Sequence, residues 1–130
     1  MPFRMRIPQS QVCDPGKFVD RHGRTDAVAF VRQVTSAPHP GVWRAGTQIQ
    51  SARPGELPPL MAIATFNDRG FYICDALGCH AAIYLGHDEH LIWVLDQWPL
   101  QGCVKRRSIF FDVKDGTERG NDGKAFFVIE

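Results

Sequence analysis

The sequence has 130 residues, of which 44% are hydrophobic and 22% are charged. This length and composition are typical of one globular domain that buries a core without metal ions or a disulfide framework. A formal net charge of +1 argues against nucleic acid or an anionic membrane as the partner. The sequence contains no apolar run of about 18 residues, so it predicts no membrane insertion. We therefore expect a single domain over residues 1–130.

One convincing helix is predicted, over residues 25–36. Thr25 can cap its start, and Asp26 is favourable beside the positive end of the helix dipole. Apolar residues then recur on one face, at Ala27, Val31 and Val34. The following segment, residues 38–59, is rich in Gly and Pro and is expected to be a loop in which Trp43 is the large apolar anchor.

Strands are expected in the remainder of the chain, because apolar and β-branched runs alternate there with polar turns. They are predicted at residues 60–66, 71–74, 104–111 and 125–129, in addition to a hairpin at 78–98. A helix followed by strands, without further alternating helices, predicts an α+β fold. We expect the N-terminal helix to pack on an antiparallel sheet of about five strands.

The hairpin at 78–98 carries the first chemical signal. Two apolar strands flank a polar loop at 86–90, and a register that pairs Leu85 with Leu91 places His80 opposite Asp96 on one face. A carboxylate that orients a histidine is found in hydrolase active sites. Such pairs are also found in purely structural roles, and a slip of one residue would put the two side chains on opposite faces.

The four cysteines are too few and too irregularly spaced for a disulfide scaffold, and they lack the spacing of a zinc site. We therefore expect no metal and no cofactor. One disulfide is possible, but the sequence does not pair it. Cys79 is expected in the core on the face opposite His80, Cys13 in a turn before the helix, and Cys74 and Cys103 in structural or paired roles.

Two stretches carry a family resemblance. The helix start, TDAVAFV from Thr25, and the strand HAAIYLG from His80 resemble the two signatures of the NlpC-type (papain-like) cell-wall cysteine peptidase superfamily, including the related CHAP amidases. Asp96 matches in kind the third polar residue of that superfamily. The small size and the segments 43–46, 61–66 and 96–98 look most like the amidase effectors of bacterial type VI secretion.

The resemblance implies a papain-like NlpC-type fold and a catalytic set made of the residue at position 27, His80 and Asp96. It implies peptidoglycan peptides as the substrate and, as a partner, an immunity protein in the periplasm that plugs the substrate groove. The N-terminal sequence MPFRMRIPQSQ lacks the apolar segment of a signal peptide. We therefore expect a protein made in the cytoplasm and delivered to the periplasm of a target bacterium by secretion.

The sequence departs from the superfamily at position 27, where Ala27 occupies the place of the nucleophilic cysteine. Alanine has no group that can attack an amide, so the chain as written is expected to be inactive. Because His80 and Asp96 are retained, an engineered replacement is favoured over natural decay. The alternatives are a non-catalytic module that binds peptidoglycan peptides or a protein, and a structural domain in which the His80 and Asp96 pair is incidental.

The substrate groove has three candidate residues, Trp43, Trp98 and His22. Aromatic residues in such segments also fit a core, whereas His22 lies in a loop near the helix start. The other histidines, at 39, 87 and 90, are expected on the solvated surface. Backbone N–H groups at the helix start are candidates to stabilise an oxyanion. Strand alternation turns Gln97 away from Asp96, so Gln97 is given no role in the triad.

Overall fold

The structure is a computed structural model that describes residues 2–12 and 18–130. The described residues form one α-helix, six strands and four short 3₁₀ helices. The helix is α1 (Ala27–Val34), and the strands are β1 (Ala45–Gln48), β2 (Met61–Thr65), β3 (Ala81–His87), β4 (Leu91–Asp96), β5 (Lys105–Phe110) and β6 (Phe126–Ile129).

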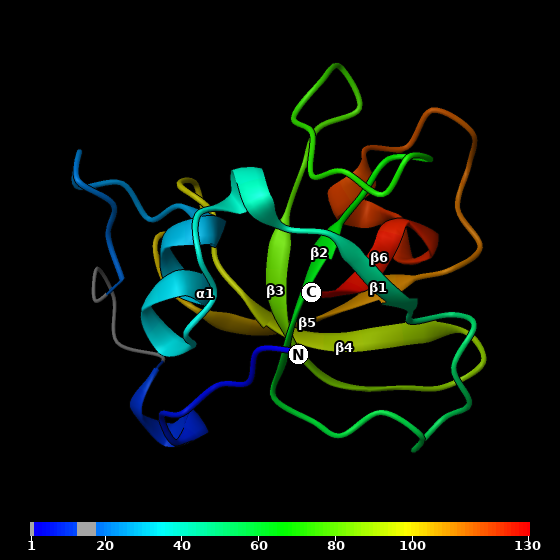
Figure 1. Cartoon of the computed structure of the whole chain (residues 1–130), viewed down its shortest axis with the longest axis horizontal. Coiled ribbons are helices and arrows are strands. Elements are labelled where there is room, and N and C mark those ends of the chain that lie inside the picture. Colours follow the sequence, from blue (N-terminus) through cyan, green and yellow to red (C-terminus); the bar gives the residue numbers. More distant parts are fainter. Residues whose placement is uncertain (1, 13–17) are drawn as a thin grey trace.

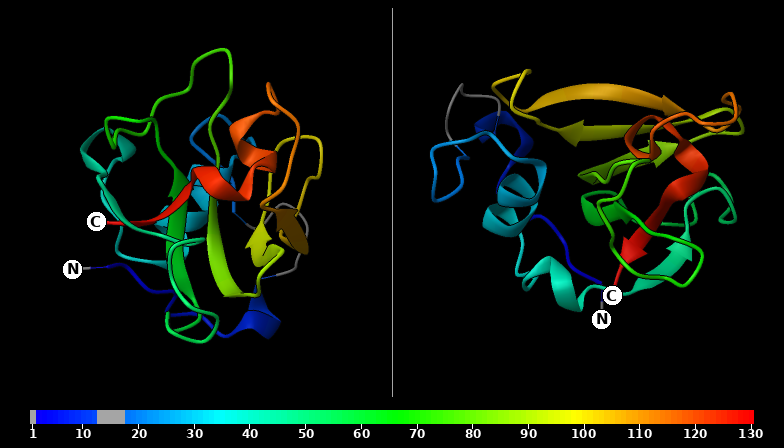
Figure 2. Two further views of the ribbon diagram at one scale, coloured as in Figure 1. Left: turned by 90° about the vertical axis from the view of Figure 1, so that its right-hand side faces the viewer. Right: turned by 90° about the horizontal axis from the view of Figure 1, so that it is seen from above.

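The six strands form one antiparallel sheet in the order β1-β6-β2-β3-β4-β5. The sheet is strongly curved, and α1 lies to one side of it, against β3 (Figures 1 and 2). The expectation of an α+β domain, with a helix packed on an antiparallel sheet, is confirmed. The chain adds its last strand, β6, inside the sheet, between the edge strand β1 and β2.

Two predicted segments differ from the structure. Strand β1 lies in the segment expected to be a loop, because it is built by pairing with distant β6, Ala45 opposite Ile129. The strand predicted at 71–74 does not form. Phe71 makes only an isolated bridge with Arg44, and the chain then continues to a disulfide that closes residues 74–79 into a short loop.

The helix is shorter than predicted, and its N-cap is Asp26 rather than Thr25. Asp26 Oδ1 accepts hydrogen bonds from the backbone N–H groups of Val28, at 2.8 Å, and Ala29, at 3.2 Å. The Thr25 hydroxyl instead donates to the carbonyl of Trp98, at 3.3 Å. A carboxylate satisfies two free helix N–H groups and also complements the dipole, so Asp26 is the better cap.

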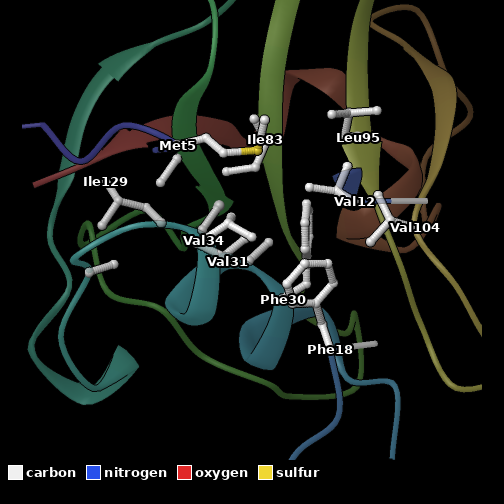
Figure 3. Close-up of a cluster of buried hydrophobic side chains, with 14 of the residues drawn as sticks. Met5, Val12, Phe18, Phe30, Val31, Val34, Ile83, Leu95, Val104 and Ile129 are labelled. Atoms are coloured by element: carbon white, nitrogen blue, oxygen red, sulfur yellow. The ribbon is translucent and has the colours of Figure 1, made fainter. Parts of the chain in front are cut away.

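Both faces of the central strands are buried, in two separate clusters. On the helix side, Phe30, Val31 and Val34 of α1 point towards Ile83 and Leu95 of the sheet (Figure 3). The opposite face is covered by a second apolar cluster, which includes Ala82, Tyr84, Ile92, Val94, Ile109 and Phe126. Strand alternation therefore sends neighbouring residues of β3 into different cores.

A β-bulge in β3 changes the environment of His87. Tyr84 pairs with Val94 whereas Gly86 pairs with Trp93, so Leu85 is the extra residue. The bulge turns His87 to the same face as Tyr84, whose hydroxyl lies 2.6 Å from His87 Nδ1. His87 Nε2 lies 2.9 Å from the carbonyl of Ala52. The expectation of a solvated His87 is therefore wrong, because its side chain is buried in a polar network.

Gln97 fastens the start of the helix to the end of β4. Its amide donates to the carbonyls of Phe18, at 2.6 Å, and Asp26, at 2.9 Å, and the residue is 1% exposed. These contacts explain how the strand edge and the helix N-terminus are held in one geometry.

Gln97→Met keeps most of the side-chain volume but removes both hydrogen bonds that the Gln97 amide donates to inner carbonyls. We expect it to lower the free energy of unfolding by about 1–3 kcal/mol, measured by urea denaturation. Gln33→Met is the matched control, since Gln33 is exposed and makes one bond to Val19, and it should change stability by no more than about 0.5 kcal/mol. Equal effects of the two variants would contradict this role for Gln97.

Candidate active site

His80 and Asp96 meet where β3 begins and β4 ends. His80 Nε2 lies 2.8 Å from Asp96 Oδ2, His80 is 8% exposed, and Asp96 is fully buried. The predicted contact is present, but the predicted register is wrong, because Ile83 pairs with Leu95 rather than Trp93. Continuing this register puts Ala82 opposite Asp96, so His80 is its diagonal neighbour. A shift of two residues keeps both side chains on the same face.

Arg107, on β5, is a third member of this cluster that sequence reasoning did not identify. Its Nε donates to the same oxygen, Asp96 Oδ2, at 2.6 Å. Arg107 also donates to the carbonyl of Gly120, at 2.7 Å, and to Asn121 Oδ1, at 3.2 Å. The sequence contained a signal, the basic run at 105–107. Only the pairing of β5 with β4 shows that one residue of this run lies beside Asp96.

His80 opens into a cavity of about 340 Å³. Its described lining consists of Gly78, Cys79, His80, Trp98, Arg107, Glu118, Gly120 and Asn121. The Trp98 ring meets the His80 ring edge to face, with centroids 6.2 Å apart, and so the groove candidate Trp98 lies in this cavity. Gly120 lies on the opposite wall of the cavity and allows the backbone there to approach His80 closely, since a Cβ on Gly120 would lie 3.2 Å from His80 Cβ.

Ala27 is buried and is not part of the lining of this cavity. It is the first residue of α1, and its neighbours Asp26 and Val28 line a second hollow of about 800 Å³. His22, exposed as expected, also lines this second hollow. Cys79 lines both hollows, so the two adjoin at the residue before His80. The structure thus joins His80 to Asp96, and it places the residues on either side of position 27, Asp26 and Val28, at the adjoining groove.

Trp43 was a candidate for lining the substrate groove, and this expectation is wrong. The side chain is completely buried, with its ring packed edge to face on Tyr72 and its Nε1 donating to the carbonyl of Pro38 at 2.9 Å. Its apolar surface is used in the helix-side core. It therefore offers no surface to a ligand.

The polar groups around the helix start are partly occupied. Asp26 already accepts hydrogen bonds from the N–H groups of Val28 and Ala29, so these two groups are not free to bind an oxyanion, contrary to expectation. Tyr72 lines the same groove. Burial, and to a smaller degree the Asp26 carboxylate, raise the pKa of Tyr72 well above its usual value. Its hydroxyl therefore stays protonated and able to donate a hydrogen bond.

A braced loop at residues 74–79 leads into His80. Cys74 and Cys79 form a disulfide, which resolves the pairing that the sequence left open and corrects the expectation of a core Cys79. Arg119 forms an ion pair with Asp75 and donates to the carbonyl of Gly78. Cys103 is free, and Cys13 lies outside the described residues. The loop thus fixes the backbone directly before the histidine.

Within the described part of the chain, no group of three or more His, Cys, Asp or Glu side chains is arranged to hold a metal ion. A search of the same residues for a helix long and apolar enough to span a bilayer finds none.

Replacing both Cys74 and Cys79 by alanine should destabilise the protein by about 2 kcal/mol, because a short loop is no longer closed in the unfolded state. Urea denaturation under non-reducing conditions measures the change. Cys103→Ala is the control, since it removes a free thiol and should alter stability by at most about 0.5 kcal/mol. A double variant as stable as this control would show that the disulfide contributes nothing.

The ion pair between Arg119 and Asp75, which holds the loop at residues 74–79, should also depend on pH. The hydrogen bond from Arg119 is the main cause that lowers the pKa of Asp75 in the folded protein. Its stabilising effect is therefore complete above the usual carboxyl pKa and is lost as pH falls through the lowered value. We expect the hydrogen-exchange protection of the Leu77 amide, which donates to Asp75 Oδ1, to decrease over that acidic range. Protection that falls identically in Asp75→Asn would exclude this cause.

Comparison with known proteins places the chain in a family. The family model described as domesticated amidase effector 2 matches residues 5–129. A solved structure, Type 6 secretion amidase effector 2 (Tae2), is similar with a TM-score of 0.73 and 26% sequence identity, over 91% of this chain and 88% of that chain. The comparison with curated protein sequences gave no match. The resemblance to type VI secretion amidase effectors is therefore confirmed, and the chain belongs to the domesticated amidase effector 2 family.

Proposed function

We propose that this protein, with a cysteine at position 27, is a cysteine amidase that hydrolyses amide bonds in the peptide stems or cross-links of peptidoglycan. We further propose that its one domain, residues 1–130, has the papain-like NlpC-type fold. The chain as written is then inactive, because Ala27 replaces the nucleophile. The observation that carries this proposal is the buried pair of His80 and Asp96, whose cavity shares Cys79 with the groove that Asp26 and Val28 line at the start of α1.

The position of residue 27 supports its role as the nucleophile. It is the first residue of a helix that packs directly against β3, the strand that His80 precedes. The positive end of a helix dipole favours a thiolate over a thiol. Cys79 is the shared wall between the groove flanking position 27 and the cavity of His80. A peptide crossing this wall would contact both halves of the site.

The pairing of His80 defines which ring nitrogen takes part. Because Asp96 Oδ2 is bonded to Nε2, proton exchange with the nucleophile and the leaving group is assigned to Nδ1. Nδ1 first takes the thiol proton, giving a thiolate and an imidazolium. The thiolate then attacks the amide carbonyl carbon, forming a C–S bond and a tetrahedral oxyanion.

Collapse of this intermediate breaks the C–N bond, and the imidazolium gives its proton to the departing amine. A thioester remains on the cysteine. Water then attacks the thioester carbonyl while Nδ1 accepts its proton, and the C–S bond breaks to release the acid and regenerate the thiol. The Tyr72 hydroxyl, on the neighbouring groove, is available to bind the peptide.

The proposal extends to the biological setting. An amidase effector of type VI secretion that cuts peptidoglycan would act in the periplasm of the recipient bacterium. The producing cell would need an immunity protein that occupies the same groove. Family membership supports this setting, since the matching family model is described as an amidase effector and the similar structure as a type 6 secretion amidase effector.

The test restores the thiol. Purified Gram-negative peptidoglycan is incubated with the Ala27→Cys variant and, in parallel, with the chain as written, and the released fragments are identified by mass spectrometry. We expect products only from Ala27→Cys. Adding His80→Gln to that variant should lower kcat/KM by about 10²- to 10⁴-fold, the usual contribution of a positioned acid or base.

The other outcomes separate the competing functions. If Ala27→Cys releases nothing while the chain as written still binds the peptides in a sedimentation assay, the amidase proposal fails and a binding module takes its place. If neither protein cuts or binds peptidoglycan, and His80→Gln changes only thermal stability, the pair of His80 and Asp96 is structural.

A further inference from the structure

We propose that Arg107 is a positioning residue of the active site, which acts on His80 through Asp96 and through the cavity wall at Gly120. This inference rests on the proposed function, in which His80 exchanges protons. It starts from one shared atom. Asp96 Oδ2 accepts from His80 Nε2, at 2.8 Å, and from Arg107 Nε, at 2.6 Å.

Asp96 is fully buried, and a buried carboxylate without a counter-ion is costly. His80 alternates between imidazole and imidazolium during the proposed reaction, so it provides a positive charge for only part of the cycle. Arginine remains charged throughout. Arg107 therefore gives Asp96 a permanent partner, and the carboxylate can hold the ring in both states of His80.

Besides Nε, both terminal nitrogens of the Arg107 guanidinium donate hydrogen bonds, one to Asn121 Oδ1 and one to the Gly120 carbonyl. Its Cζ also lies over the Trp98 ring, 5.3 Å from the centroid. A guanidinium with all three nitrogens engaged by the protein is fixed in place.

Arg107 also contacts the opposite side of the histidine site, through Gly120. Gly120 belongs to the short 3₁₀ helix η3 (Arg119–Asn121) and packs against His80, so closely that a Cβ at this position would lie 3.5 Å from His80 Cγ. Arg107 holds η3 by two hydrogen bonds and holds Asp96 by a third. The imidazole is thus clamped between a carboxylate and a wall that the same arginine fixes.

The test measures kcat and KM in the Ala27→Cys background, with a soluble peptidoglycan fragment as substrate. Arg107→Gln should lower kcat by about 10- to 100-fold, the usual cost of a displaced catalytic group, with KM changed by less than about twofold. Arg107→Lys should recover part of the loss, because it restores the charge but not the planar fork. Arg106→Gln is the matched control. Arg106 is the residue before Arg107 and its side chain is exposed, so this substitution should leave kcat unchanged.

A double-mutant cycle tests whether the effect passes through Asp96. In an Asp96→Asn background, Arg107→Gln should lower kcat by much less than it does alone, because the shared oxygen is already changed. A full and independent loss would contradict the proposal. So would a raised KM with parental kcat, which would make Arg107 a substrate-binding residue. If Arg107→Gln does not fold, Arg107→Lys with a reduced kcat at parental KM carries the test.

An NMR measurement on the chain as written is independent of activity. Cross-relaxation between the His80 and Trp98 rings should weaken in Arg107→Gln and persist in Arg106→Gln. Identical spectra of the His80 ring in both variants would overturn the inference. If Ala27→Cys is itself inactive but the ring contact responds to Arg107, the proposed function fails and the positioning of His80 by Arg107 stands.

Discussion

The buried carboxylate of Asp96 is the constraint on which the site depends. It has no exposed surface, and one of its oxygens, Oδ2, receives donors from both neighbouring strands, His80 before β3 and Arg107 on β5. Among the described residues, Oδ1 has no hydrogen-bond partner. Since a buried charge must be compensated, these strands cannot separate here without a large cost. The hydrogen bonds that orient His80 therefore also hold β3, β4 and β5 together.

Local patterns in the sequence were sufficient for the helix and for the central hairpin. The apolar spacing after Asp26 and the polar loop before Leu91 are properties of neighbouring residues, and both elements form. The register between β3 and β4 could not be predicted from neighbouring residues, because the bulge at Leu85 shifts the pairing. The contact between His80 and Asp96 was nevertheless predictable, since a shift of two residues changes an opposed pair into a diagonal pair on the same face.

Several features that sequence reasoning missed depend on partners far along the chain. Strand β1 exists because β6 pairs with it, and Trp43 is buried because the helix-side core closes over it. In the sequence, Arg107 is one residue of a short basic run, and only the pairing of β5 with β4 brings it to Asp96. Similarity of residue type found the family, but it did not reveal that Cys79 lies between the cavity of His80 and the groove lined by Asp26 and Val28.

The place of β6 has a consequence for biosynthesis. By the time residue 110 is made, the chain holds His80, Asp96 and Arg107, yet the strand that lies between β1 and β2 is still to come. Phe126, whose ring packs 6.5 Å from that of His80, arrives with this strand. Long-range pairing of this kind is slow and cannot begin before its partner is synthesised. The sheet is therefore completed after translation of β6, and a nascent chain carries the site residues without the site.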